Sequence, residues 1–313
     1  MAPPAREAPE YVQVFPTLRC NRSCGFCFNR GLDAPPDIPL AHFAAILDRL
    51  RAAGVDTVDI LGGEPTLHPQ LDALVRAVAA RGMRTTLSTN GDGGLELLER
   101  IEDTVGRGTL RVGVSVNEGP VPGPVASYLE RRRPVVKSVC ERRRDIPGAL
   151  AEHLARPGTE GYLIFRDALT LADLSETLSY PEFLDRLAVV RRRHRNLEGV
   201  VCGGFVPDLK RSPEMAGARC PAGSGKFSVM PDGSAWPCYL LFGRPEFRLG
   251  NLVTDSFEEI WRHPALEFFR SFRGNTCRDE ACAHHAACHG GCPAVSLRVT
   301  GDVAAPDPRC VAP

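Results

Sequence analysis

The sequence has no excess of either charge and no long apolar run. Its 38 Lys and Arg balance 38 Asp and Glu, which gives no reason to expect binding to nucleic acid or to an anionic membrane. No apolar stretch reaches the roughly 18 residues that a membrane span needs, and the first residues, MAPPAREAPEY, lack the apolar core of a signal peptide. We therefore expect a cytoplasmic protein with no nucleic acid or membrane partner.

The composition also excludes a disordered or fibrous chain. Hydrophobic residues make up 43% of the 313 residues, as in ordinary globular proteins. This length exceeds one average domain but suits a large domain with a small appendage. Twelve cysteines are many for a cytosolic chain, where thiols stay reduced, so we expect metal binding rather than disulfides.

Short apolar runs alternate with segments of helical spacing over the first two thirds of the chain. This pattern predicts βαβ units, a parallel sheet and an α/β fold. The predicted strands are residues 11–15, 57–61, 83–88, 110–116, 134–139, 162–165 and 200–201, and the predicted helices are 40–53, 71–80, 95–101 and 183–193. About six such units fit a partial (β/α)6 barrel better than a closed eightfold one.

The alternation stops near Pro207, and seven cysteines with many turn residues follow. We predict a flexible arm over residues 1–10, a partial barrel over 11–203, a linker over 204–219 and a small cysteine-rich domain over 220–313. The last domain has few long apolar runs, so we expect bound metal to stabilise it.

Three cysteines, Cys20, Cys24 and Cys27, form a C-x3-C-x2-C triplet directly after the first predicted strand. Three thiolates on one short loop can hold three corners of a cubane iron–sulfur cluster and leave the fourth iron open for chemistry. The competing interpretations are a zinc site completed by a distant residue, or three unrelated thiols.

With this triplet the chain resembles the radical S-adenosylmethionine (radical SAM) superfamily, whose cysteines follow the first strand of a partial barrel. Phe26 lies at the family's aromatic position before the third cysteine. The resemblance implies a [4Fe–4S] cluster on the triplet and S-adenosylmethionine (SAM) as cofactor. It also implies reductive cleavage of SAM to a 5′-deoxyadenosyl radical that removes a hydrogen atom from substrate, with a flavodoxin- or ferredoxin-type protein as reductant.

Further segments match the family's SAM-binding positions. Glycines allow a ligand close to the backbone, and a carboxylate can accept from an ammonium group, which suits a segment that binds the SAM amino group. The resemblance assigns SAM contacts to Gly62, Gly63, Glu64 and Pro65, to Ser88 and Asn90, and to Ser115 and Asn117. For both strand-end pairs the alternative is simple capping of the strand. Arg166, or one of residues 131–133, is the predicted partner of the SAM carboxylate.

The tail resembles the SPASM extension of radical SAM maturases. Cys220 is followed by Gly233-x4-Cys238, then by Cys277-x4-Cys282-x5-Cys288-x3-Cys292, and finally by Cys310. The spacing between Cys277 and Cys282 departs from the family's x2. The resemblance implies two auxiliary [4Fe–4S] clusters, the first held by Cys220, Cys238 and Cys292 and the second by Cys277, Cys282, Cys288 and Cys310. The first set is one ligand short.

The tail also admits a structural zinc site, because His284, His285 and His289 lie among its cysteines. Two cysteines remain outside all of these sets. Cys140 is most simply a small buried residue. Cys202 lies at the end of the last predicted barrel strand, and its competing roles are a core thiol, a ligand to the incomplete cluster or a hydrogen-atom donor to a substrate radical.

We therefore predict an enzyme that starts radical chemistry at an unactivated C–H bond of a small molecule or a ribosomal peptide. Oxidation, crosslinking and epimerisation are the outcomes that the resemblance implies, with the auxiliary clusters as electron acceptors or relays. The alternatives are a non-catalytic iron–sulfur protein for electron transfer or redox sensing, and a zinc-stabilised interaction module. The predicted SAM segments argue against an electron carrier, which needs no SAM pocket.

Overall fold

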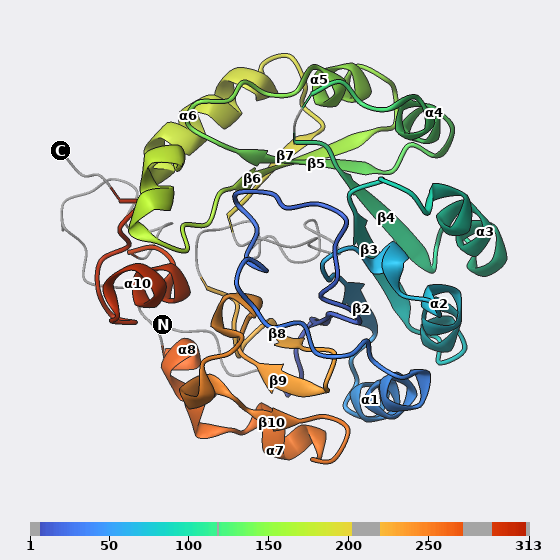
Figure 1. Cartoon of the computed structure of the whole chain (residues 1–313), viewed down its shortest axis with the longest axis vertical. Helices are drawn as coiled ribbons and strands as arrows, with labels where there is room; N and C mark the ends of the chain where they lie inside the picture. The colour runs from blue at the N-terminus through green and yellow to red at the C-terminus, as the bar shows by residue number, and fades with distance from the viewer. Residues whose placement is uncertain (1–6, 118, 202–219, 272–289, 311–313) are drawn as a thin grey trace. The chain divides into compact units, whose positions relative to one another are not determined.

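The structure is a computed structural model that describes residues 7–117, 119–201, 220–271 and 290–310. Its strands belong to an open, mixed sheet of ten strands, and helices follow many of them (Figure 1). The predicted α/β fold is confirmed. The chain divides into two compact units, the first made of residues 1–113 and 221–271 and the second of residues 114–220 and 272–313.

The first unit combines the beginning of the chain with part of the cysteine-rich tail. Its strands are β1 (Tyr11–Val14), β2 (Thr57–Ile60), β3 (Arg84–Thr89), β8 (Lys226–Val229), β9 (Ser234–Trp236) and β10 (Gly250–Asn251), and they adjoin in the order β10-β9-β8-β1-β2-β3. Its α-helices are α1 (Leu40–Ala52), α2 (Leu71–Ala79), α3 (Leu95–Val105), α7 (Phe257–Trp261) and α8 (Glu267–Ser271). Short 3₁₀ helices are η1 (Pro65–Leu67), η4 (Tyr239–Leu241), η5 (Pro245–Phe247) and η6 (Pro264–Leu266).

Strand β1 is the centre of the first unit. It pairs in parallel with β2 on one side and with β8 on the other, and all four of its residues are buried. The one polar residue of the strand, Gln13, accepts from Lys226 Nζ at 3.2 Å and donates to Asp59 at 3.4 Å. Without these bonds the buried polar groups would have no hydrogen-bond partner, which would lower the stability of the fold by about 1–3 kcal/mol for each group.

The helices of the first unit bury one apolar stripe each. In α2 the buried residues are Leu71, Leu74, Val75 and Val78, which recur at the three- and four-residue spacing of one helix face. Figure 1 shows α1, α2 and α3 along one side of β2 and β3. The helices therefore leave the carboxyl ends of the strands uncovered, and loops follow the strands at these ends.

The second unit repeats the strand–helix alternation. Its elements are α4 (Gly123–Arg132), β5 (Val135–Cys140), α5 (Gly148–Leu154), β6 (Glu160–Phe165), η2 (Leu171–Glu176), α6 (Tyr180–Arg191), β7 (Leu197–Val200) and α10 (Pro293–Thr300). Strands β5, β6 and β7 are consecutive and parallel. Strand β4 (Leu110–Ser115) contains the boundary between the units.

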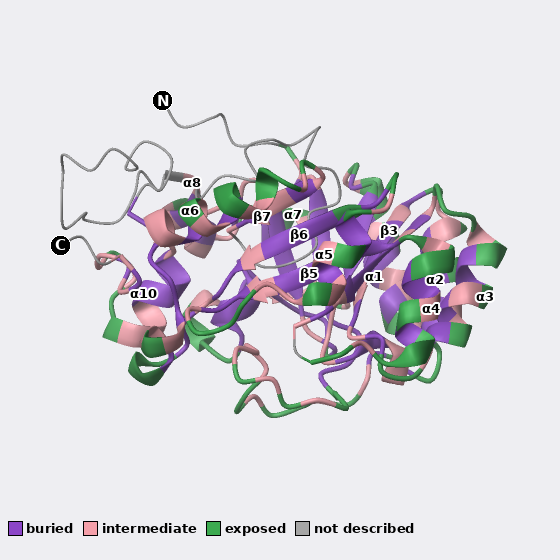
Figure 2. Ribbon diagram, turned by 90° about the horizontal axis from the view of Figure 1, so that it is seen from above, coloured by how far each residue is buried: buried purple, intermediate pink, exposed green. Residues whose placement is uncertain are grey.

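Each strand and helix predicted from apolar spacing is present within a few residues of its predicted ends. The sequence analysis missed α4 and α5, which start at Gly123 and Gly148 and are short. It also missed β8, β9 and β10, because the tail lacks long apolar runs. Figure 2 shows β5 and β6 largely buried, which is why their apolar runs were readable in the sequence.

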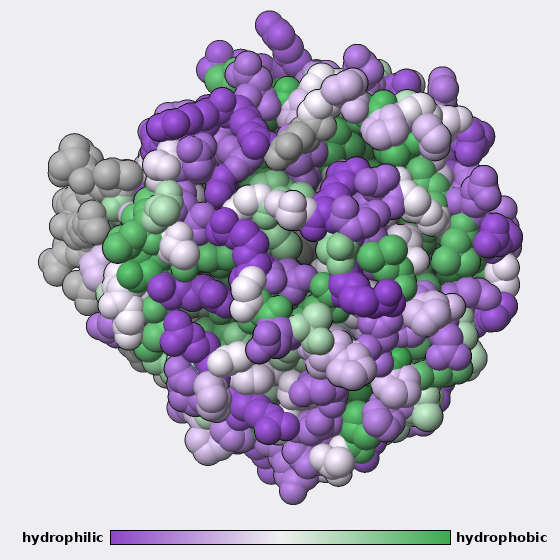
Figure 3. Space-filling view, in the orientation of Figure 1, coloured by the Kyte–Doolittle hydropathy of each residue, from purple (hydrophilic) through white to green (hydrophobic). Residues whose placement is uncertain are grey.

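None of the helices in the described ranges combines the length and the apolar composition that a bilayer crossing requires. On the face drawn in Figure 3, hydrophilic residues predominate and hydrophobic ones form separate patches. This mixture is the one expected of a surface in contact with water.

Candidate functional site

The cysteine triplet occupies the loop that follows β1. Cys20 is exposed, whereas Cys24 and Cys27 are half-buried, and none of the three forms a disulfide. The Cys27 N–H donates to the Cys24 carbonyl at 3.1 Å, which folds this part of the loop into a tight turn. Burial raises the pKa of the Cys27 thiol, and its neighbours Cys24 and Cys20 raise it further. The three sulfur atoms therefore lie near enough to repel one another as thiolates, and a bound cationic group would relieve that repulsion.

The donor set of this loop fits an iron–sulfur cluster. A cubane cluster takes its thiolates on different irons, so its ligands need not converge. Three thiols on one loop, spaced four and three residues apart, meet that requirement.

The glycines of the Gly62-Gly63-Glu64-Pro65 segment follow β2 and lie against the backbone that leads into the cysteine loop. Gly63 N–H donates to Thr17 O at 3.0 Å, and Glu64 N–H donates to Arg19 O at 2.8 Å. A Cβ atom on Gly63 would overlap the Arg19 carbonyl and lie 2.5 Å from Leu18 O. Only glycine allows this approach, so the segment is fixed to the cysteine loop through the backbone.

The Glu64 carboxylate is fully buried and turned into its own loop. Its Oε1 atom accepts from the Thr66 N–H at 3.1 Å, from Thr66 Oγ1 at 2.8 Å and from Thr89 Oγ1 at 2.8 Å. Its Oε2 atom accepts from the Asn90 N–H at 2.7 Å. A carboxylate has about four acceptor positions. These hydrogen bonds join the ends of β2 and β3, with Pro65 buried at the start of η1.

Asn90 connects the end of β3 to the cysteine loop. Its Nδ2 atom donates to Asn21 Oδ1 at 2.8 Å and lies 3.9 Å from Cys20 Sγ. Ser88 is half-buried in the same strand, and Phe26 is half-buried in the cysteine loop. The structure thus brings the predicted segments at 20–27, 62–65 and 88–90 together within the first unit.

An aromatic cluster that the sequence analysis missed supports the same loop. Phe28, directly after the triplet, lies 5.4 Å from Phe15 and 4.8 Å from Tyr239, measured between ring centroids. Phe15 directly follows β1, and Tyr239 follows the buried Cys238. Phe28 and Tyr239 are more than 200 residues apart in the chain, so no local sequence pattern could have predicted their contact.

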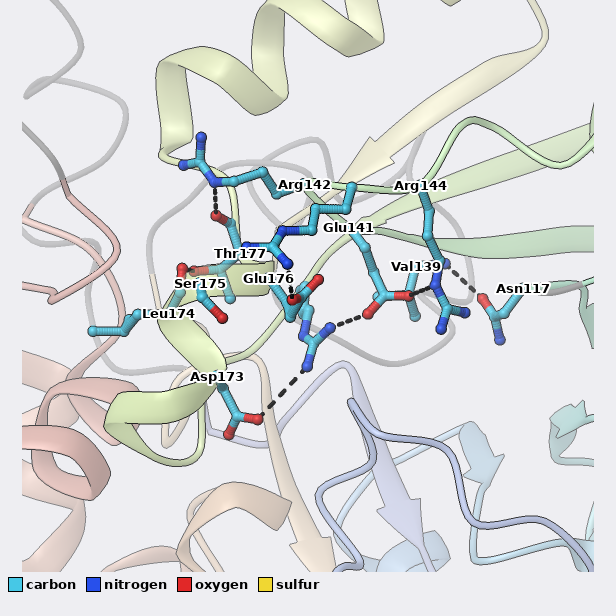
Figure 4. Close-up of polar contacts among 12 residues, drawn as sticks. Asn117, Val139, Glu141, Arg142, Arg144, Asp173, Leu174, Ser175, Glu176 and Thr177 are labelled. Atoms are coloured by element: carbon cyan, nitrogen blue, oxygen red, sulfur yellow. Dashed lines mark hydrogen bonds and ion pairs between the residues drawn. The ribbon is translucent and has the colours of Figure 1, made fainter.

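In the second unit, Ser115 and Asn117 lie at the end of β4. The Asn117 Oδ1 atom accepts from the Val139 N–H at 2.8 Å (Figure 4). This bond holds the end of β4 to β5. Ser115 is half-buried.

Arg166 directly follows β6 and is buried. One guanidinium nitrogen is paired with Glu141, which directly follows β5, and the other lies 3.6 Å from Asp173 Oδ1. Figure 4 shows the carboxylates of Glu141 and Asp173 with a guanidinium group between them. Two flanking carboxylates fix the orientation of this arginine at the carboxyl end of its strand.

The other predicted arginines, residues 131–133, lie in the last turn of α4 and directly after it, before the start of β5. Arg131 donates to Ser127, and Arg133 donates to Pro157 O at 3.2 Å. They therefore lie at the amino end of β5. Ligand sites of parallel sheets lie at the carboxyl ends, so Arg166 is the better placed of the predicted residues.

Four of the predicted auxiliary ligands are described. Cys238 lies in the first unit, whereas Cys220, Cys292 and Cys310 lie in the second. Burial raises the pKa of the Cys292 thiol well above its usual range, and nearby Cys220 raises it further. Cys220 and Cys292 are therefore neighbours, as a shared cluster requires.

The other predicted ligands and histidines lie outside the described residues. They are Cys277, Cys282, Cys288, His284, His285 and His289, together with Cys202 and the predicted linker at 204–219. Cys140 ends β5 and is 2% exposed, and burial raises the pKa of its thiol. This matches its interpretation as a core residue.

Two family models match the chain. Residues 14–139 match the radical SAM superfamily, and residues 220–293 match the iron–sulfur cluster-binding SPASM domain. These ranges contain the cysteine triplet and the first six cysteines of the tail.

Curated proteins align along almost the whole chain. A PqqA peptide cyclase of Streptomyces rochei is 26% identical over 344 residues, covering 99% of this chain and 91% of the relative. The mycofactocin maturase MftC of Mycobacterium ulcerans is 27% identical over 331 residues, covering 94% and 86%.

Solved structures share the fold at lower identity. Streptococcus suis SuiB bound to S-adenosylmethionine superposes with a TM-score of 0.73 at 19% identity, covering 98% of this chain and 78% of SuiB. SuiB bound to its precursor peptide SuiA gives 0.72 at 19% identity, covering 98% and 77%. The anSMEcpe structure with bound AdoMet gives 0.59 at 14% identity, covering 96% and 93%.

Proposed function

Because the chain belongs to the radical SAM enzymes that carry a SPASM domain, we propose that it modifies a ribosomally made peptide by radical chemistry at an unactivated C–H bond. The observation that carries the proposal is the alignment of 99% of the chain with a peptide cyclase. The arrangement of the Cys20, Glu64 and Asn90 segments around one loop supports the SAM-dependent step.

Cys20, Cys24 and Cys27 are the proposed ligands of the SAM-binding cluster. When bound, this cluster and SAM supply a reductively generated 5′-deoxyadenosyl radical that abstracts a hydrogen atom from the peptide. The protein's own residues position the ligand. We assign the contacts with the SAM amino group to the Gly62-Gly63-Glu64-Pro65 segment, whose carbonyl and carboxylate oxygens can accept from an ammonium group.

Arg166 is the proposed partner of a ligand carboxylate. Its fixed orientation between Glu141 and Asp173 supports this role, since a preorganised guanidinium loses less conformational freedom on binding. Ser88 and Ser115 are the remaining half-buried hydroxyl groups assigned to SAM.

The tail cysteines are the proposed ligands of two auxiliary [4Fe–4S] clusters, with the ligand sets that the resemblance to the SPASM extension implies. Such clusters accept or relay the electron that a substrate radical gives up when it is oxidised. A flavodoxin- or ferredoxin-type protein is the proposed source of the electron for SAM cleavage.

The test is anaerobic reconstitution, followed by iron and sulfide analysis and assay of 5′-deoxyadenosine. We expect about twelve irons per chain, three cubanes in all, and release of 5′-deoxyadenosine with SAM and reductant. The matched variant Cys20/Cys24/Cys27→Ala should lose about four irons and all SAM cleavage. A protein that binds three clusters but neither binds nor cleaves SAM would support an electron carrier instead.

The substrate class requires a separate test, in which the enzyme is incubated with peptides encoded beside its gene and with small-molecule candidates. A mass change in a peptide that depends on SAM and reductant is expected. Turnover of small molecules alone would refute the peptide proposal while leaving the radical step intact.

A further inference from the structure

The segment after α10 inserts a buried arginine into the second unit. Arg309 is 3% exposed, and its guanidinium lies 4.5 Å from the centroid of the Phe165 ring. Its Nη1 atom donates to the Arg166 carbonyl at 2.9 Å and lies 3.5 Å from Asp167 Oδ1. Arg309 therefore attaches this segment to the carboxyl end of β6.

Asp307 joins the same arginine to a predicted cluster ligand. Its carboxylate accepts from Arg309 Nε at 3.1 Å and from Arg309 Nη2 at 2.7 Å. Asp307 Oδ2 also accepts from the Cys292 N–H at 2.8 Å. One buried carboxylate thus connects a bidentate arginine to the backbone of Cys292.

The backbone at Gly291 is shaped to receive Asp307. Gly291 has a φ of +92°, and a Cβ atom there would overlap the Asp307 side chain. Left-handed backbone and this close approach both require glycine. The contact between Asp307 and Cys292 therefore depends both on the Asp307 carboxylate and on a glycine at position 291.

We propose that the Asp307–Arg309 pair positions Cys292 at the carboxyl end of β6 and places a permanent positive charge beside the auxiliary cluster that Cys292 ligates. The inference rests on the proposed function, because it requires Cys292 to be a cluster ligand. The Asp307–Arg309 pair is a positioning element that is part of neither the cysteine pattern nor the SAM-binding segments.

The physical reason lies in the charge of the cluster. Reduction adds one negative charge to the cluster, and a fixed cation nearby stabilises the reduced state. Arginine serves this role in a buried site because it stays protonated. Asp307 and Asp167 carry two negative charges against the single positive charge of Arg309, so loss of Arg309 alone would leave two uncompensated carboxylates beside the thiolate.

The test compares the reconstituted wild type with Arg309→Met, Arg309→Lys and Cys292→Ala by iron analysis and by EPR-monitored redox titration. Arg143→Met is the matched control, because Arg143 is 73% exposed in the same unit. We expect Arg309→Met to lower the midpoint potential of one auxiliary cluster, with about a tenfold lower reduced-to-oxidised ratio at a fixed potential, equivalent to about 59 mV for one electron. Arg309→Lys should restore much of this shift, and Arg143→Met should cause none.

Three further outcomes would overturn the inference or its premise. Equal midpoint potentials in wild type and Arg309→Met would refute the electrostatic role. If Arg309→Met does not retain the cluster, the comparison of Arg309→Lys with wild type decides, and a midpoint potential in Arg309→Lys that is lower by the full shift of about 59 mV would refute the electrostatic role. If Cys292→Ala loses no iron, the ligand assignment in the proposed function fails instead.

Discussion

Gly63 is a residue at which one methyl group decides the geometry of the candidate site. A Cβ atom there would collide with the backbone of residues 18 and 19, which cannot move without displacing the cysteine loop. We expect Gly63→Ala to destabilise the protein by about 1–3 kcal/mol. If about 1.4 kcal/mol of this loss is also a loss in the free energy of SAM binding, SAM binds about tenfold more weakly.

Calorimetry with reconstituted protein measures the binding, and chemical unfolding measures the stability. Gly108→Ala is the control, because a Cβ atom on Gly108 meets no atom within 4 Å. Equal SAM affinity in the two variants would contradict the close packing that we describe.

The Glu64 carboxylate gives a second prediction at this scale. Glu64→Gln keeps the shape but replaces one acceptor oxygen by an NH₂ group, which would face a donor. We expect a loss of about 2–3 kcal/mol in the free energy of unfolding, because a buried charged acceptor is removed. Urea unfolding checks this, with the exposed Glu96→Gln as control. A variant as stable as the wild type would show that the four hydrogen bonds contribute little.

The sequence predicted which residues belong to these segments but not what they contact. Glu64 and Arg166 were both identified by motif or by position at a strand end. Their partners Asn90 and Glu141 are 26 and 25 residues away. Such pairings follow from the strand register, which the sequence does not specify at this precision.

At the scale of elements, α6 begins with a capping box that is tied to the loop after β5. Ser179 and Glu182 cap each other, and Arg142 donates to both Glu182 oxygens at 2.8 Å. The hydrogen bonds from Arg142, and then those from Ser179, lower the pKa of Glu182 from 4.5 to about 2. The start of the helix is therefore sensitive to acid.

Because the pKa of Glu182 is lower in the folded protein than in the unfolded chain, its ionised carboxylate stabilises the fold at pH values above about 4.5. This contribution is lost as the pH falls from about 4.5 to about 2. The Glu182 side chain is 42% exposed, so solvent screening reduces the contribution to about 1 kcal/mol. We expect Glu182→Gln to be less stable than wild type by this amount at pH 7 and equally stable near pH 2. Urea titrations of the apo-protein across this range check the prediction.

Glu258→Gln is a suitable control for that series, because the Glu258 side chain is 66% exposed in its ion pair with Arg262. Exposed pairs of this kind contribute little at any pH. A difference for Glu182→Gln that stays constant with pH would contradict the charge-based explanation.

Long periodic elements were predictable, and short ones were not. The stripe of α2 and the apolar runs of β2 and β5 are visible in the sequence because burial selects them. Strands β8 to β10 have two to four residues each and lie among turn residues. They are joined to the sheet through β8, which pairs with β1, a contact between distant parts of the chain.

At the scale of the whole molecule, the tail completes the core of the first unit. We therefore expect a chain truncated after residue 219 to misfold or aggregate, because β1 would lose β8 and expose an unpaired edge of a buried strand. Size-exclusion chromatography and near-UV circular dichroism check this. A soluble, cooperatively unfolding fragment that binds four irons would contradict it.

The pairing of β1 with β8 also has a consequence during synthesis. Gln13 leaves the ribosome long before its partner Lys226, which is 213 residues further along the chain. The nascent chain must therefore hold an apolar strand and three thiols without their final neighbours until Lys226 has emerged. Throughout that interval the cysteines of the first loop lack their final packing, and oxygen can oxidise them.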